Sequence, residues 1–237
     1  MNYKKLAIIG GGAAGFFCAA NLPLEKINNK LRITIFEQHK EPMIKLSASG
    51  GARCNLTNNI QDINDLVKYY PRGEKFLYSV FNQFSAMDTI NWFEEKNVKL
   101  YTDECGCVFP NSDNSETITN TLLKQIPKNI TEIRPGARID KVQHENGQFI
   151  LFTNNRQLEF DFVLICTGGT YSIKGPIEDF KGYELAIQAG HTIVTAKPAL
   201  SSMKIADKNI ADLAGITIND ITVVAYFNNK KIAEHSG

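Results

Sequence analysis

The hydrophobic pattern of the first forty residues predicts a βαβ unit. Residues 6–9 form a continuous apolar run, which is typical of a strand buried on both faces. A glycine cluster follows, and residues 13–22 then predict a helix that ends before Pro23, because proline disfavours helix in the preceding residue. Residues 31–36 alternate and are rich in β-branched side chains, which predicts a second strand. Strand, turn, helix and strand together make one βαβ unit.

The middle of the chain has helical spacing of its apolar residues. We expect helices over residues 60–70, 73–84, 85–97 and 115–126, and a short strand over 98–101. The aromatic side chains concentrate in this region, where packing into the core is a better explanation than an aromatic ligand platform.

The second half of the chain changes to a period of two. Three strands are expected, with Asn146-Gly147 as the turn between the first two, because both residues tolerate positive φ. A buried strand, a helix, another short strand and a final β-hairpin with a turn at Asn228-Asn229 should follow. The predicted ranges are 137–142, 149–153, 157–160, 162–166, 182–190, 191–194, 216–227 and 230–233.

These elements predict an α/β chain, namely a Rossmann-like dinucleotide-binding domain that carries a three-strand β-meander, followed by the start of a β-rich inserted domain. We place the first domain at residues 1–196 and the second at 197–237, because the pattern changes after Lys197-Pro198.

Composition and charge exclude several classes of function. The chain has 237 residues, 43% of them hydrophobic, and a formal net charge of +1. Such a balance gives no electrostatic case for binding nucleic acid or an anionic membrane. The stretch from Lys4 to Leu22 superficially resembles a signal peptide, but its glycines suit a tight turn, so we expect a folded-domain start without a targeting segment.

Cysteine usage indicates reduced thiols and a cytoplasmic protein. The five cysteines are scattered, and no disulfide framework is required in a chain of this size. Cys105 and Cys107 flank one glycine, but no second Cys or His pair stands at zinc spacing, so we expect no metal site.

The strongest chemical signal is the run Gly10-Gly11-Gly12-Ala13-Ala14-Gly15, directly after the first strand. In a G-x-G-x-x-G turn, the first glycine permits the tight turn, the second lets the backbone approach a pyrophosphate, and the third allows close helix–strand packing. The phosphate charge then lies at the positive end of the helix. Glu37 follows Gly15 by 22 positions and ends the second strand, where a carboxylate binds ribose hydroxyls and disfavours a 2′-phosphate.

The choice between FAD and NAD depends on resemblance. The block at residues 45–58, KLSASGGARCNLTN, closely resembles a signature of the HI0933-like family of FAD-dependent oxidoreductases, which includes bile-acid reductases and aminoacetone-oxidase-type bacterial flavoproteins. Three further segments match that family: Val108-Phe109-Pro110 with Ser112-Asp113, Ile165-Cys166-Thr167-Gly168-Gly169, and residues 182–191. The Thr-Gly-Gly element is similar to the second FAD-contacting motif of two-dinucleotide-domain flavoproteins.

The resemblance implies an FAD site that extends beyond the glycine turn. Ile139 would meet the adenine through its backbone, or else fill the core as an ordinary strand residue. Lys45 would neutralise phosphate or remain a solvated lysine, and Cys54 would pack beside the cofactor without thiol chemistry. The full expected cofactor-binding set is Gly10, Gly12, Ala13, Ala14, Gly15, Glu37, Gln38, Lys45, Ser49, Gly50, Gly51, Arg53, Cys54, Asn55, Ile139, Thr167, Gly168 and Gly169.

The resemblance also implies an oxidoreductase that transfers hydride through FAD, with NAD(P)H as electron donor and a small carbonyl, alkene or amine as substrate. No residue is assigned as catalytic acid or base, and the sequence does not indicate an oligomeric state. In the family, a C-terminal segment returns to the FAD domain, and we expect this chain to stop before that segment. Two other hypotheses stay open: a catalytically silent, truncated nucleotide-binding fragment, and an NAD-only dehydrogenase.

Overall fold

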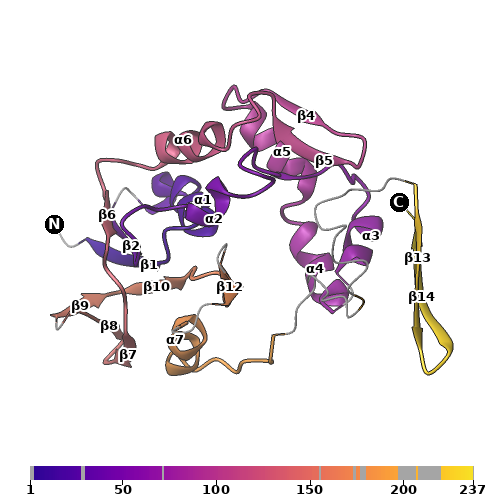
Figure 1. Cartoon of the computed structure of the whole chain (residues 1–237). Coiled ribbons are helices and arrows are strands. Elements are labelled where there is room, and N and C mark those ends of the chain that lie inside the picture. Colours follow the sequence, from indigo (N-terminus) through magenta and orange to yellow (C-terminus); the bar gives the residue numbers. More distant parts are fainter. Residues whose placement is uncertain are drawn as a thin grey trace. The chain divides into compact units, whose positions relative to one another are not determined.

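We describe a computed structural model of the chain (Figure 1). The structure describes residues 3–27, 30–70, 72–154, 156–172, 175–176, 180–196, 207 and 220–236. The chain forms two compact units, Met1–Ile193 and Val194–Gly237, which are described separately.

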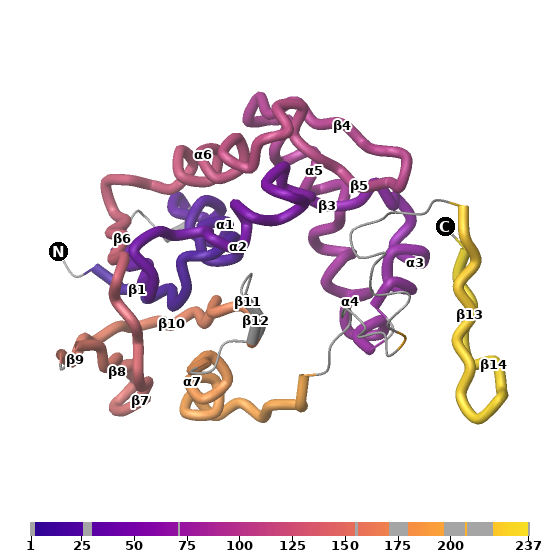
Figure 2. The backbone as a smooth tube through the Cα atoms, in the orientation of Figure 1, coloured from indigo at the N-terminus to yellow at the C-terminus, as the bar shows by residue number. Residues whose placement is uncertain are grey.

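A parallel sheet organises the first unit. Its strand order is β10-β1-β2-β6, and the chain crosses from β1 through α1 to β2. Phe162–Ile165 forms β10, which pairs in register with β1 although about 155 residues separate them along the chain (Figure 2). The remaining members are β1 at Lys4–Ile9, α1 at Ala13–Ala20, β2 at Leu31–Glu37 and β6 at Thr131–Pro135.

Side chains of β1 point alternately to the two faces of this sheet and into two cores. Ile8 packs among buried side chains from α1, α5 and α6, including Phe16 and Leu122. Its neighbour Ile9 points the other way, into a core that contains Leu151 of the meander and Leu185 of α7. Helices therefore cover one face of the sheet, and the meander with α7 covers the other (Figure 1).

The other elements of this unit are shorter. The helical ones are η1 at Leu24–Ile27, α2 at Ile44–Ser47, α3 at Ile63–Leu66, η2 at Val67–Tyr69, α4 at Glu74–Phe81, α5 at Ala86–Glu94, α6 at Glu116–Gln125 and α7 at Gly182–Gln188. The strands are β3 at Thr57–Asn58, β4 at Leu100–Thr102, β5 at Cys107–Pro110, β7 at Lys141–Glu145, β8 at Gln148–Thr153, β9 at Arg156–Phe160, β11 at Tyr171–Ser172 and β12 at Gly175–Pro176. β3, β5 and β4 form a small antiparallel sheet, and β7, β8 and β9 form the predicted meander.

The α/β Rossmann-like fold class is confirmed, and the turn chemistry agrees with it. Asn146 and Gly147 both have positive φ, and so do Asn228 and Asn229, as two-residue hairpin turns require. In the second unit, β13 (Thr222–Phe227) pairs with β14 (Lys230–Ser236). The part of the predicted strand at residues 216–219 lies outside the described residues.

Several predicted boundaries were wrong. The single helix expected over 60–70 is one turn of α-helix followed by 3₁₀-helix, and residues 191–194 form no strand. The strand expected over 137–142 begins at Lys141, because the amides of Gly136 and Ala137 donate instead to the carbonyls of His39 and Glu37 at the end of β2. β6 was missed because its sequence, Thr-Glu-Ile-Arg-Pro, is mostly polar; its pairing with β2 supplies the order that its own pattern lacks.

Candidate functional site

The glycine turn lies where β1, β2 and β10 all end. The Gly10 amide donates to the Phe36 carbonyl at 2.8 Å, and the backbone of Gly10 has φ +112°. A methyl group on Gly10 would reach within 2.6 Å of the Cys166 carbonyl carbon. One on Gly15 would overlap the Gly10 carbonyl oxygen. Only glycine therefore fits these two positions, as the motif predicts.

The N-terminus of α1 has no side-chain cap. Its N-cap is Gly12, which makes no side-chain hydrogen bond, and within the described helix no acidic residue stands in the first turn. The α5 helix differs, because Ser85 and Asp88 form a full capping box there. A methyl group on Gly12 would meet no described atom within 4 Å, and Ala13 is exposed. The first-turn amides of α1 thus face open space, where an anion can approach them.

Glu37 is held in place beside this turn. Its side chain is buried, with 8% of the residue exposed, at the end of β2. One carboxylate oxygen accepts from the Gly11 amide at 2.9 Å and the other from the His39 amide at 2.8 Å. Each oxygen retains further acceptor capacity, so the carboxylate can also accept from ribose hydroxyls.

The loop after α2 has an unusual backbone. Gly50, Gly51, Ala52 and Cys54 all have φ between +56° and +68°. For the two residues that are not glycine, this conformation costs about 1 kcal/mol or more each, and such strain concentrates at functional sites. Local hydrogen bonds keep the loop in this shape, since the Cys54 amide donates to the Ser49 carbonyl at 2.9 Å.

This loop is tied to both other motifs through α2. The Met43 amide donates to the Gly11 carbonyl at 2.8 Å, and the Lys45 ammonium donates to the Gly169 carbonyl at 3.0 Å. Ser115, at the start of α6, donates its hydroxyl to the Ser47 carbonyl at 2.8 Å. The structure therefore brings the glycine turn, the 43–54 segment and the Thr-Gly-Gly segment together.

Arg53 is directed toward the small antiparallel sheet. Its guanidinium lies over the Phe109 ring at 4.4 Å, and its Nε donates to the Gly50 carbonyl at 3.2 Å. Nearby, the Tyr101 hydroxyl donates to Asp113 at 2.6 Å, and this bond raises the pKa of Tyr101. Lys45 therefore contacts the Thr-Gly-Gly segment, whereas Arg53 contacts the small antiparallel sheet.

The cysteines near the motifs are poor candidates for thiolate chemistry. Cys54 is buried, and burial raises its pKa. Burial, with a smaller contribution from Cys18, raises the pKa of Cys166 to about 11. Both thiols are therefore protonated at neutral pH, which agrees with a packing role for Cys54.

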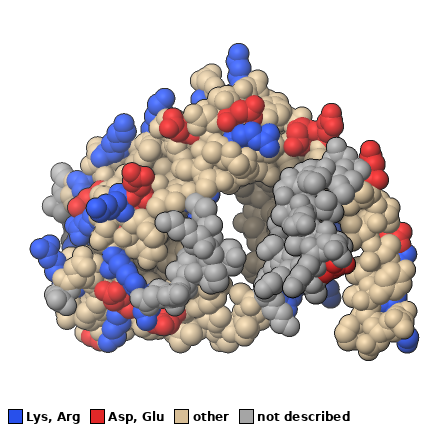
Figure 3. All heavy atoms as spheres, in the orientation of Figure 1, with Lys and Arg blue, Asp and Glu red and all other residues tan. Residues whose placement is uncertain are grey.

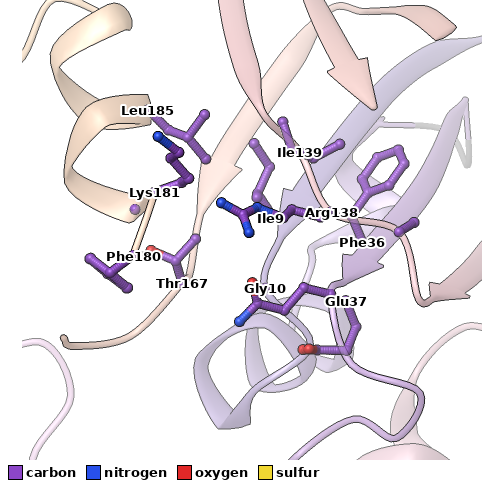
Figure 4. Close-up of a pocket in the computed structure, with 13 residues that line it drawn as sticks. Ile9, Gly10, Phe36, Glu37, Arg138, Ile139, Thr167, Phe180, Lys181 and Leu185 are labelled. Carbon is purple, nitrogen blue, oxygen red and sulfur yellow. The ribbon is translucent and has the colours of Figure 1, made fainter. Parts of the chain in front are cut away.

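A pocket opens between the ends of β1 and β2, the segment before β7, and α7 (Figure 4). Of the predicted residues, Gly10, Glu37, Gln38, Ile139 and Thr167 line it. The Ile139 side chain itself is buried in the core beneath the meander. Residues 49–55 form no part of this pocket. The predicted site thus has two parts. One is the pocket beside Glu37, and the other is the strained loop after α2, in the same segment as Lys45.

Sequence reasoning missed several pocket residues. Arg138, Phe180, Lys181 and Leu185 also line the pocket, and Gly11 holds Glu37. Arg138 directly precedes the predicted Ile139, but its sequence position did not indicate that its side chain faces a pocket, because this depends on how β2 and the meander meet. Lys181 and Leu185 belong to the segment that begins α7, and nothing in its sequence pattern indicated a pocket.

The parallel sheet, its glycine turn and its meander define a Rossmann domain of the α/β class. The protein-family model described as "HI0933-like protein Rossmann domain" matches residues 4–227. The chain therefore belongs to the HI0933-like family, which confirms the predicted family.

Two curated relatives show how far the likeness extends. A 3-dehydro-bile acid delta(4,6)-reductase of Clostridium scindens is 28% identical over 235 residues, which cover 99% of this chain and 55% of that protein. A ribosomal RNA dihydrouridine synthase of Haemophilus influenzae is 27% identical over 245 residues, covering 99% and 59% respectively. The chain thus spans little more than half the length of these relatives.

Solved structures agree with the fold. An adenylylsulfate reductase from Archaeoglobus fulgidus matches with a TM-score of 0.52 at 15% identity, over 79% of this chain and 36% of that one. The FrdA chain of an Escherichia coli quinol fumarate reductase matches with a TM-score of 0.50 at 14% identity, over 72% and 34%. At these identities the likeness concerns fold alone.

Among the described residues, no helix is long and apolar enough to cross a membrane.

Proposed function

We propose that the chain binds FAD, with the pyrophosphate at the N-terminus of α1 and the adenosine ribose on Glu37. The observation that carries this proposal is the uncapped start of α1, with open space at Gly12, directly beside a carboxylate held by Gly11 and His39. Amide donors suit the pyrophosphate and a carboxylate suits the ribose diol, so the residues fit the two polar parts of the adenosine half.

In this proposal the remaining predicted residues hold the flavin half. Lys45, Gly168 and Gly169 lie together and would contact the ribityl chain and phosphate, and the strained 49–55 loop would border the ring. When bound, FAD supplies hydride transfer, while the protein supplies binding, orientation and electrostatics.

We infer that the substrate carries a conjugated carbon–carbon double bond. The names of both curated relatives describe chemistry at such a bond, in a steroid ring for one and in uridine for the other. The net reaction adds one hydride and one proton across the double bond, and NAD(P)H is the proposed source of the two electrons. This choice narrows the predicted carbonyl, alkene or amine to the alkene.

We propose a small molecule, rather than RNA, as the substrate. The net charge is +1, and on the face shown in Figure 3 acidic and basic side chains are interspersed rather than gathered by sign. RNA binding relies on clustered positive charge. A cytoplasmic location, and residues 197–237 as the start of an inserted β-rich domain, complete the proposal.

Isothermal titration of the purified chain with FAD, FMN and NAD tests the cofactor. We expect FAD to bind and give flavin absorbance at about 450 nm, and NADH or NADPH to bleach it under anaerobic conditions. A conjugated enone should then restore the colour. A folded chain that binds only NAD would support the dehydrogenase hypothesis, and one that binds no nucleotide would support the silent fragment.

A further inference from the structure

Arg138 lies in the pocket next to the proposed ribose site. The Ala137 amide donates to the carbonyl of Glu37 at 2.8 Å, so the backbone just before Arg138 is attached to the residue that would hold the ribose. The Asp140 amide on the other side donates to the Phe152 carbonyl at 2.9 Å. Both flanks of Arg138 are therefore fixed by backbone hydrogen bonds.

The arginine side chain is directed into the pocket rather than into the core. Ile139 is 3% exposed and fills the core beneath the meander, whereas the Arg138 side chain is 33% exposed and extends across the pocket toward Thr167 (Figure 4). Its Nε lies 3.4 Å from a carboxylate oxygen of Asp140, whose side chain is 57% exposed.

The position of the base follows from the two polar contacts. With the pyrophosphate at the start of α1 and the ribose on Glu37, the base must leave the ribose on the side away from Gly12. That side is occupied by the 137–139 segment and α7, where the lining includes Phe36 and Leu185. A planar cation beside apolar walls is suited to stack on a purine face.

We propose that Arg138 is a specificity-determining residue that stacks on the adenine of the bound dinucleotide. This inference rests on the proposed function. The guanidinium recognises the aromatic base rather than the phosphates, so it distinguishes FAD and ADP from ligands that lack adenine. Among the described residues, the other charged groups that line the pocket are Glu37, assigned to the ribose, and Lys181, which pairs with Glu184 at 2.8 Å.

Titration calorimetry with FAD, ADP, FMN and inorganic pyrophosphate tests the proposal. For Arg138→Met we expect about fivefold to tenfold weaker binding of FAD and ADP, with FMN and pyrophosphate unchanged within about twofold. Arg138→Lys keeps the positive charge but lacks the planar guanidinium, so its affinity for FAD and ADP should lie between those of wild type and Arg138→Met. The matched control is Arg156→Met, an exposed arginine on β9 that does not line the pocket.

Two results would overturn the inference. If wild type binds FAD and Arg138→Met binds FAD and ADP equally well, the side chain does not contact the base. If ADP and pyrophosphate weaken to the same extent, Arg138 neutralises phosphate instead. Should Arg138→Met fail to unfold cooperatively, Arg138→Lys decides the same comparison. Failure of the proposed function is distinguishable, because wild type itself would then bind no FAD.

Discussion

Two alanine substitutions in the glycine turn should have separate effects. Gly15→Ala should lower stability by disturbing packing, and Gly12→Ala should weaken ligand binding. A methyl group on Gly15 would overlap the Gly10 carbonyl oxygen and come within 3.1 Å of Ile8 Cγ2. Overpacking of this kind costs about 2 kcal/mol of unfolding free energy. For a chain of this size that corresponds to a Tm lower by about 4–8 °C.

For Gly12→Ala we expect the opposite result, namely little change in stability but a loss of FAD affinity. Its φ is −90°, which alanine adopts readily, and a methyl group there meets no described atom within 4 Å. Loss of a favourable N-cap residue and reduced freedom of the unfolded chain nearly cancel, so Tm should move by about 2 °C or less. The methyl group would occupy the space assigned to the pyrophosphate, and we expect FAD affinity to fall about tenfold or more.

The assays are thermal unfolding followed by circular dichroism without cofactor, and calorimetric titration with FAD. An unchanged FAD affinity in Gly12→Ala would refute the placement of the pyrophosphate. An unchanged Tm in Gly15→Ala would refute the argument that helix and turn are in closest contact there.

Three further results are expected. Glu37→Gln places an amide donor where two backbone amides now donate, so FAD and ADP should bind about tenfold more weakly while pyrophosphate is unaffected in the same titration; equal binding of ADP would contradict the ribose assignment. Because burial raises the pKa of Cys166 to about 11, iodoacetamide at pH 8 should label the exposed Cys105 well before Cys166, with Cys166 reacting only as the pH approaches 11; peptide mass spectrometry showing equal labelling would refute this. Ser85→Ala removes the capping box of α5 and should lower Tm by about 2–4 °C, a loss of about 1 kcal/mol, without altering FAD affinity; a loss of affinity would mean that α5 supports the site.

Sequence pattern predicted the centre of the fold because local and tertiary preferences agree there. Residues 6–9 form a continuous apolar run, residues 31–36 alternate with β-branched side chains, and the glycines between these two segments have few other uses. The strand β6 and the helical region around α3 were described incorrectly, because pairing with β2 and the packing of neighbours decide those segments.

The sequence predicted those parts of the candidate site whose geometry depends on residues close together along the chain. Gly10, Gly15 and Glu37 follow from a motif whose geometry is fixed by adjacent residues. The contact of Lys45 with Gly169 joins positions 124 residues apart, and the pocket position of Arg138 depends on how β2 and the meander meet. No pattern within a short window contains that information.

The hydrogen bonds from Met43 to Gly11 and from Lys45 to Gly169 connect three segments of the proposed site. A ligand bound to these segments would therefore also affect how long the whole domain survives in its folded state. A dinucleotide that touches all three connected segments binds only when each is folded, so the free energy of binding adds to that of folding. At a cofactor concentration 100 times Kd this addition is about 2.7 kcal/mol. Under the proposed function, the supply of flavin in the cell would therefore govern how quickly proteases remove this protein, as well as how much of it is active.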